Sequence, residues 1–213
     1  TTIRNVELDD LLGRDPVVLD SAGLAEWLGN RVAMVTGAGG SIGAELCHQI
    51  ARFRPARLVL FDISDAALYE IQTALSDTFP QLPLVTVVGD VKHAALVEDV
   101  LERERPSVIF HAGAYKHVPL MEETNAWQAV RNNSYGTYVL ARAAVAARVE
   151  KFVLVSSDKA VNPTNVMGAT KRLAEIVCQS LQGGVTQFVL VRFGNVFGSA
   201  GSVIPRFSEQ IAR

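Results

Sequence analysis

The sequence has only two cysteines and four histidines, and neither set is arranged as a metal or redox motif. Cys47 and Cys178 lie far apart inside helical patterns and form no CxxC pair, so we expect buried free thiols. The histidines match neither HExxH nor another metal-ligand spacing, so we predict no metal site. His111 ends an apolar run, and we expect a hydrogen-bonded structural role for it.

Long apolar runs and blocks of one charge are also missing. No stretch approaches the roughly 18 consecutive apolar residues of a membrane span, and the first residues do not combine a basic flank with a short apolar core. The formal net charge is -2 and no dense Lys/Arg block occurs, which argues against general binding to nucleic acid or anionic membranes. We therefore expect a soluble, cytoplasmic chain.

What the sequence does contain is enough apolar material for a full core. The 213 residues, 49% of them hydrophobic, fit one globular domain, alone or with an arm. Residues 1–30 have short apolar clusters broken by Gly13 and Pro16, and we interpret them as an arm or linker packed on the domain. Residues 31–213 form the predicted domain itself.

From Arg31 onward, β-rich apolar runs alternate with amphipathic stretches of helix length. The six runs are residues 31–36, 57–61, 83–88, 107–110, 151–156 and 186–192. Near-continuous apolar strands separated by helices predict a parallel sheet covered on both faces, an α/β doubly wound fold. Ser41 to Phe53 and Leu173 to Leu181 show helical spacing, and the Ala-rich stretch Ala126 to Val149 predicts one long helix whose small residues permit close packing on the sheet or a partner subunit.

The first predicted strand runs directly into a glycine-rich turn, and a helix follows. Glycines allow a sharp turn and a close approach of the backbone to a pyrophosphate, while the helix N-terminus presents N–H groups to the anion. A tight turn without a ligand is the alternative. The strand before and the helix after favour dinucleotide binding. The candidate cofactor residues of this turn are Gly37, Gly40, Ser41, Ile42 and Gly43.

Two acidic residues follow the next strands. Asp62 ends the second run, roughly 20 residues beyond the last glycine, and can accept hydrogen bonds from an adenosine ribose, which favours NAD over NADP. Asp90 and Val91 follow the third run and can hold the adenine, although an Asp before a helix is also an ordinary N-cap. Both interpretations of Asp90 stay open.

A second polar group follows the fifth run. Ser157, Asp158 and Lys159 lie just past the predicted strand, on the side of an open α/β sheet where ligands bind. A helix beginning at Met167 places that residue and Lys171 one turn apart on the same face. This is more polar chemistry than a structural loop requires, and it predicts an active site.

Several motifs together resemble one enzyme family. They are TGAGGSIG with GxxGxxG spacing, HAGAYKHVP at 111–119, NNSYGT at 132–137, SSDKAVNPTNVMGATK at 156–171 and RFGNVFGSAGSVIP at 192–205. From Arg31 to Arg213 the chain is similar to the extended short-chain dehydrogenase/reductase superfamily. Within it the motifs resemble the polysaccharide-biosynthesis branch of UDP-N-acetylglucosamine 4,6-dehydratases. Met167 stands where most of the superfamily has a catalytic Tyr, a departure shared with the long, membrane-anchored dehydratases.

The resemblance implies an NAD(P)-binding Rossmann fold and a reaction without net redox change. A hydride leaves sugar C4, water leaves from C5 and C6, and the hydride returns to C6, giving a UDP-4-keto-6-deoxy sugar for capsule, lipopolysaccharide or related glycans. Family members continue past the position of Arg213 into a smaller substrate lobe, so we expect a shortened catalytic core. The resemblance also implies a homo-oligomer, and a parent protein that can be anchored at the cytoplasmic face of the bacterial inner membrane.

The resemblance assigns roles residue by residue. Lys171 is expected to bind the nicotinamide ribose, Ser157 to hydrogen-bond sugar O4, Asp158 to protonate the departing hydroxyl and Lys159 to take the C5 proton. The last two roles require shifted pKa values, because an ordinary Asp is ionised and an ordinary Lys protonated at pH 7. Met167 has no exchangeable proton. The acceptor of the O4 proton is therefore a water, Asp158, or Lys171 through a relay.

Other positions carry supporting expectations. Lys116 matches a position that contacts cofactor and substrate, Ala112 in the same run is a cofactor candidate, and Asn195 matches a substrate-binding asparagine. Asn133 is expected to support the loop geometry near the site. Trp27 and Trp127 are expected to be packing residues without a functional role.

Two other functions compete with the dehydratase. A UDP-sugar 4-epimerase or reductase would share the fold, although an epimerase normally keeps Tyr where Met167 stands and the Asp158–Lys159 pair suits elimination. A non-catalytic NAD(P)-binding or oligomerisation module is the third interpretation, since fold analogy alone does not establish a reaction.

Overall fold

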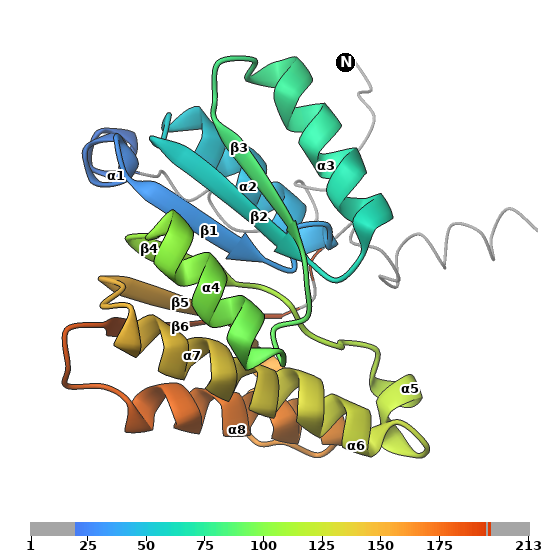
Figure 1. Cartoon of the computed structure of the whole chain (residues 1–213). Helices are drawn as coiled ribbons and strands as arrows, with labels where there is room; N and C mark the ends of the chain where they lie inside the picture. The colour runs from blue at the N-terminus through green and yellow to red at the C-terminus, as the bar shows by residue number, and fades with distance from the viewer. Residues whose placement is uncertain (1–19, 195, 197–213) are drawn as a thin grey trace, which may run out of the picture.

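A six-stranded parallel sheet lies between two layers of helices in the computed structural model, which describes residues 20–194 and 196 (Figure 1). The strands are β1 (Val32–Thr36), β2 (Arg57–Asp62), β3 (Leu84–Val88), β4 (Val108–His111), β5 (Lys151–Ser157) and β6 (Gln187–Phe193). Their order in the sheet is β3-β2-β1-β4-β5-β6, and every neighbouring pair is parallel. The predicted doubly wound α/β fold is confirmed.

The connections between strands are mostly helical. The α-helices are α1 (Ser21–Leu28), α2 (Ser41–Arg52), α3 (Asp65–Thr78), α4 (Ala94–Glu104), α5 (Val118–Glu122), α6 (Ala126–Ala129), α7 (Gly136–Ala146) and α8 (Val166–Ser180). A π-helical segment, η2 (Val130–Tyr135), joins α6 to α7, and a short 3-10 helix, η3 (Asp158–Ala160), follows β5. None of the described helices is both long and apolar enough to cross a membrane.

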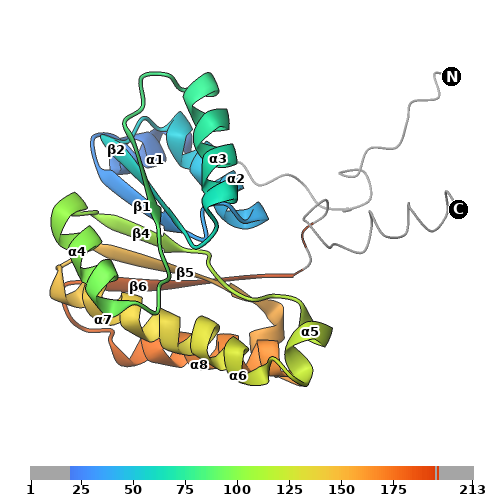
Figure 2. The same cartoon turned by 45° about the vertical axis from the view of Figure 1, so that its right-hand side comes forward.

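Each face of the sheet has its own apolar core. Helices α1, α2 and α3 cover one face, where Leu28, Cys47 and Leu68 are buried against β1 and β2. Helices α4, α7 and α8 cover the other face, with Ala144 and Cys178 buried there (Figure 2). Both cysteines are free and buried, as the sequence predicted. From β1 the chain adds β2 and β3 on one side of the sheet, and then adds β4, β5 and β6 on the other side. At this switch point between β1 and β4, a crevice opens at the carboxyl ends of the two strands.

The stretch predicted as one long helix, Ala126 to Val149, is helical only as far as Ala146, and its middle differs from an α-helix. Residues 130–135 form a π-helix, whose wider turn places Asn133 and Ser134 in the interior. The alanines of α7 behave as expected: Ala141 and Ala144 are fully buried and let the helix pack closely on the sheet. The π segment bears directly on the site described below.

The end of the 1–30 stretch packs on the domain, in line with its interpretation as an arm. Leu28 of α1 is buried, and the ring of Trp27 lies 4.2 Å from the Lys151 ammonium at the start of β5. Trp27 is therefore a packing residue. The same expectation is wrong for Trp127, whose side chain is 66% exposed on α6.

Candidate functional site

A cleft of about 320 Å³ opens at the carboxyl ends of β1, β2, β3 and β4. The glycine-rich turn after β1 forms one wall, and the residues that follow β2, β3 and β4 form the others. Its lining includes these predicted cofactor residues: Gly37, Gly40, Asp62, Asp90, Val91 and Ala112. The structure thus gathers residues from four separate connections into one crevice.

Close backbone packing shapes the glycine turn. A Cβ on Gly43 would lie 1.9 Å from the Gly37 carbonyl oxygen, so this position tolerates no side chain without a shift of the backbone. The next helix, α2, begins at Ser41, and no side chain caps its N-terminus. An uncapped helix start facing a cleft is a favourable place for an anionic group.

Asp62 holds the turn in place. One carboxylate oxygen accepts a hydrogen bond from the Gly39 N–H (3.0 Å) and the other accepts from the Ser64 N–H (3.0 Å). Asp90 does not cap α4, because the N-cap of that helix is His93. Its carboxylate instead pairs with Lys92 at 2.8 Å. The N-cap interpretation of Asp90 is therefore wrong.

The predicted catalytic turn lies at the end of β5. Ser157 Oγ donates to Asp158 Oδ1 (3.0 Å) and accepts from the Lys159 N–H (3.2 Å), while Lys159 Nζ lies 3.2 Å from the same carboxylate oxygen. The Asp158 side chain is 54% exposed. Partial burial favours a higher pKa for Asp158, but the bonds from Ser157 and Lys159 outweigh it and lower the pKa. The upward shift that an acid role requires is absent in this arrangement.

Helix α8 lies directly against this turn. Asn165 caps the helix by accepting from the Gly168 N–H (2.8 Å), and the Val166 N–H donates to Glu122 of α5 (2.8 Å). The helix therefore begins at Val166, one residue before the predicted start. A Cβ on Gly168 would lie 2.3 Å from the Lys159 carbonyl oxygen, so a glycine is required for this close approach.

The buried face of α8 carries Met167 and Lys171, 4% and 7% exposed. Lys171 Nζ donates to the Val155 carbonyl oxygen (2.8 Å) in β5. Burial lowers the pKa of Lys171 to about 8, although Cys178 and Glu175 act in the opposite direction. Lys171 thus changes charge close to physiological pH.

His111 is the structural histidine that the sequence predicted. Its Nδ1 lies 2.6 Å from Thr36 Oγ1, and its Nε2 lies 3.0 Å from Thr137 Oγ1. The Thr137 hydroxyl donates to the Asn133 carbonyl oxygen, so it accepts from Nε2–H, and Nδ1 accepts from Thr36. Burial, and to a lesser degree the charge of Lys171, lower the pKa of His111 to about 3. The imidazole is neutral at pH 7.

Asn133 ties the π segment to its neighbours. Its side chain accepts from the Tyr115 N–H (2.8 Å), donates to the Tyr115 carbonyl (3.0 Å) and donates to Thr170 Oγ1 of α8 (3.0 Å). These bonds fix the loop after β4 next to the helix that carries Lys171. The expected supporting role of Asn133 is confirmed.

Two further predicted residues are not drawn into these contacts. Lys116 is exposed on the loop after β4, at the ligand side of the sheet. Asn195 lies outside the described residues. The sequence reasoning missed Glu175, which is fully buried in α8 and bonded to Ser156 and Arg192. An Arg inside an apolar strand and a Glu one turn after Lys171 were the available signals.

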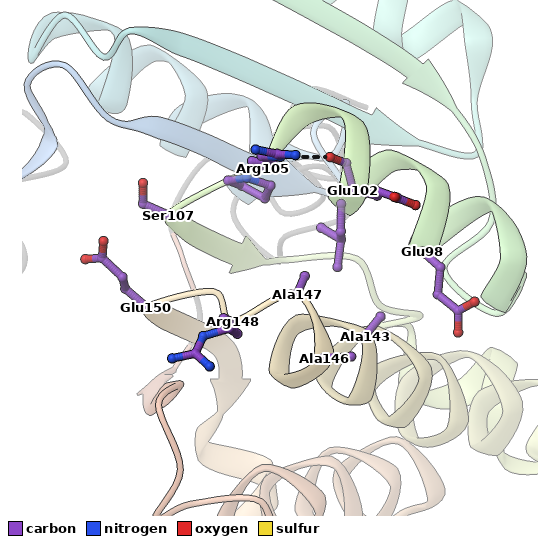
Figure 3. A pocket seen from close by; sticks show the side chains of 11 residues that line it. Glu98, Glu102, Arg105, Ser107, Ala143, Ala146, Ala147, Arg148 and Glu150 are labelled. Atoms are coloured by element: carbon purple, nitrogen blue, oxygen red, sulfur yellow. Dashed lines mark hydrogen bonds between the residues drawn. The ribbon is translucent and has the colours of Figure 1, made fainter.

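A second cleft of about 520 Å³ lies at the opposite end of the strands, near their amino ends, between the carboxyl ends of α4 and α7 (Figure 3). Alanines of α7 face α4 across it, and charged side chains of both signs, including Glu98, Glu102, Arg105 and Arg148, surround it. None of the predicted site residues lines this cleft. Among the described residues, no group of three or more His, Cys, Asp or Glu side chains is placed to hold a metal ion.

Comparison with known proteins gives a consistent picture. A family model described as "Polysaccharide biosynthesis protein" matches residues 33–213. The capsular polysaccharide biosynthesis protein CapD of Staphylococcus aureus is 49% identical over 98% of this chain and 35% of its own length. In a solved structure, Pen from Bacillus thuringiensis, 34% identity accompanies a TM-score of 0.78 over 88% of this chain and 57% of that one.

More distant relatives include two kinds of enzyme. A UDP-N-acetylglucosamine 4,6-dehydratase (inverting) of Campylobacter jejuni is 30% identical over 84% of this chain and 53% of its own length. A UDP-glucose 4-epimerase of Rickettsia rickettsii is 31% identical over 85% of this chain and 54% of its own. The chain therefore spans about a third of CapD and about half of these two enzymes.

Proposed function

We propose, since this chain belongs to the polysaccharide biosynthesis protein family, that it carries the cofactor site and catalytic turn of a nucleotide-sugar 4,6-dehydratase acting on UDP-N-acetylglucosamine. The observation that carries the proposal is the Asp158–Lys159 pair at the end of β5, beside a helix with Met167 in place of a proton-exchanging residue. An elimination needs one acid and one base close together, and this pair supplies both.

NAD fits the cleft better than NADP. The backbone packing at Gly43 and the uncapped start of α2 suit a pyrophosphate. Asp62 lines the cleft and would repel a 2′-phosphate, whereas the charge of Asp90 is already offset by Lys92 at 2.8 Å. Bound NAD would supply a store for the hydride between its departure from sugar C4 and its return to C6.

In this proposal, the Asp158–Lys159 pair reaches the required protonation states, a protonated carboxyl and an unprotonated amine, by an internal proton transfer. Movement of one proton from Lys159 Nζ to Asp158 Oδ1, across their 3.2 Å contact, makes the carboxyl an acid and the amine a base in a single step. A bound sugar that excludes water favours these neutral forms. In the elimination, Lys159 takes the C5 proton, and Asp158 gives its proton to the departing hydroxyl, which leaves as water. These two transfers restore the ion pair.

Ser157 and Lys171 would position the reacting groups. Ser157 at the end of β5 donates to sugar O4 in place of its present bond to Asp158, and Lys171 holds the nicotinamide ribose. Met167 only packs. The O4 proton goes to water or through Lys171, because Asp158 has to take its proton from Lys159 for the elimination, and a Lys171 pKa of about 8 supports the relay through that amine. Lys116 and Asn195 would contact the UDP-sugar.

A UDP-sugar 4-epimerase is the second candidate, favoured by the epimerase among the relatives. It would oxidise C4 and return the hydride to the same carbon without losing water. We prefer the dehydratase because the Asp158–Lys159 pair suits an elimination, a step that an epimerase does not perform, and because an epimerase normally keeps Tyr where Met167 stands. We also propose that the chain acts as a homo-oligomer in the synthesis of a bacterial surface glycan.

The test is to incubate the chain with NAD and UDP-N-acetylglucosamine and to follow the nucleotide sugar by mass spectrometry. The proposal expects a product that lacks one water, formed by the unmodified chain and not by Asp158→Asn. An isomer of unchanged mass would identify the epimerase. No turnover together with tight NAD binding would mean a non-catalytic dinucleotide-binding module and would overturn the proposal for this chain.

A further inference from the structure

A buried ion pair lies directly beneath the catalytic turn. Glu175 of α8 is fully buried, and its carboxylate makes four hydrogen bonds. Oε1 accepts from Ser156 Oγ (2.6 Å) and Arg192 Nε (2.8 Å), while Oε2 accepts from Arg192 Nη2 (2.6 Å) and Arg172 Nη1 (3.0 Å). Every strong acceptor direction of the carboxylate is therefore occupied.

These bonds join three elements at the ligand side of the sheet. Ser156 of β5 and Arg192 of β6 are paired in register, so the carboxylate bridges two adjacent strands close to their carboxyl ends. The next residue of β5 is Ser157, which begins the catalytic turn. Glu175 thus fixes the strand ends from which the reactive side chains project.

Glu175 also faces Lys171, one helical turn earlier on α8. Among other titratable groups of this region, two are uncharged at neutral pH and two form an ion pair with each other. Burial raises the pKa of the Cys178 thiol to about 12, and His111 on β4 is neutral. Asp158 and Lys159 on η3 pair with each other.

Stability alone does not account for such a pair. The side chains of Arg172 and Arg192 are 39% and 37% exposed, so water screens both pairs and each contributes little net stability, while the buried carboxylate costs free energy to remove from water. Burial by itself favours a higher pKa for Glu175, but the bonds from Arg192, Ser156 and Arg172 lower the pKa to about 2. The carboxylate is therefore charged at neutral pH.

We propose that Glu175 is a positioning residue that holds Lys171 in its charged, oriented state and fixes the strand ends carrying Ser157 and Asp158. The inference rests on the proposed function in assigning Lys171 to the reaction site. Its test, however, reads Lys171 itself and does not depend on turnover.

The experiment is an NMR titration of the chain labelled with carbon-13 at lysine Cε, with the Lys171 signal identified by its absence in Lys171→Arg. In Glu175→Gln we expect Lys171 to titrate at lower pH by roughly one unit or more, because the neighbouring negative charge is lost. In Arg192→Gln the carboxylate stays and a positive charge goes, so we expect titration at higher pH. This second variant also covers the case that Glu175→Gln fails to fold.

The matched control is Glu104→Gln. Glu104 is 7% exposed and pairs with Arg57 (2.7 Å) and Arg103 (2.9 Å) at the opposite edge of the sheet. The substitution Glu104→Gln should lower the melting temperature and leave the Lys171 titration unchanged. If Glu175→Gln and Arg192→Gln also leave that titration unchanged, or move it in the same direction, the positioning role is overturned, whatever the dehydratase assay shows.

Discussion

The cofactor cleft and the catalytic turn both lie at the carboxyl ends of the strands, but they are built differently. The cleft is shaped by main-chain contacts: the close approach of Gly43 to Gly37 and the hydrogen bond from the Gly39 N–H to Asp62. The catalytic turn consists of side chains, and its Asp158 is 54% exposed. The comparison teaches that the proposed dinucleotide site is already shaped by the backbone, whereas the proposed acid–base chemistry depends on what covers the turn.

Helix α8 connects the two regions. Its first turn packs on the catalytic turn through Gly168, while Thr170 accepts a hydrogen bond from Asn133 of the π segment. Asn133 in turn holds Tyr115, which lines the cofactor cleft. A substitution in one region can therefore be compared with a matched substitution in the other.

The largest effect on NAD binding is expected from Gly43→Ala. The added methyl would lie 1.9 Å from the Gly37 carbonyl oxygen, so the phosphate loop must open. NAD affinity, measured by calorimetry, should fall by roughly 100-fold or more, because several hydrogen bonds to charged oxygens are lost together. Gly184→Ala is the control, since a Cβ there would meet no atom within 4 Å and the residue lies outside the cleft. Near-normal binding by Gly43→Ala would show that the cleft is not shaped by this contact.

The catalytic turn should respond in the opposite manner. Asp158→Asn removes the proposed acid, and kcat for dehydration should fall by about 10² to 10⁴ while NAD affinity stays unchanged. Asp77→Asn, at an exposed site on α3, is the control for surface charge. A parallel loss of NAD affinity in Asp158→Asn would indicate that the two regions are not separable.

A third prediction concerns acid stability near the junction of the two regions. His111 has a pKa of about 3 in the fold, against an ordinary value of 6.5, so the unfolded chain binds more protons between these values. The free energy of unfolding should therefore fall as the pH drops from 6.5 towards 3, by roughly 3 kcal/mol between pH 7 and 4. Glu175, with a pKa of about 2 against 4.5, adds a further loss below pH 4.5.

Urea unfolding of His111→Gln at pH 7 and pH 4 tests this dependence. The variant should lose most of the pH-dependent difference, because glutamine does not titrate. His93→Gln, at an exposed position, should retain it. An unchanged difference in His111→Gln would mean that other groups cause the acid sensitivity.

The smallest effect is expected from Met167→Leu. Met167 is 4% exposed, and a leucine of similar volume should cost less than about 1.5 kcal/mol of stability and leave kcat largely intact. Met167→Ala should cost about 2–5 kcal/mol, because it leaves a cavity. A severe loss of kcat in Met167→Leu, without loss of stability, would give the thioether a direct role in the reaction.

Much of the fold could be predicted from the sequence. All six strands lie within one residue of their predicted ends, since strands buried on both faces read as uninterrupted apolar runs. The glycine turn was predictable for a similar reason: its spacing reflects local backbone geometry. Helix α8 begins at Val166, only one residue before its predicted start, because Asn165 is an ordinary N-cap.

The parts that failed depend on distant partners. The π segment forms where Asn133 bonds Tyr115 and Thr170, which are remote in the sequence. Asp158 is a local exception: hydrogen bonds from its neighbours Ser157 and Lys159 lower its pKa, and the sequence does not show that both side chains turn toward its carboxylate. The Glu175 cluster needs α8, β5 and β6 together before its charges meet. Sequence periodicity gives the elements, while long-range contacts decide the chemistry of their side chains.

The most direct measurement uses UDP-N-acetylglucosamine carrying deuterium at C4, incubated with the chain and NAD and followed by NMR and mass spectrometry. If the turn after β5 performs a 4,6-dehydration, the product lacks one water and carries the deuterium at C6. Return of the deuterium to C4 in a sugar of unchanged mass would contradict the account and identify an epimerase.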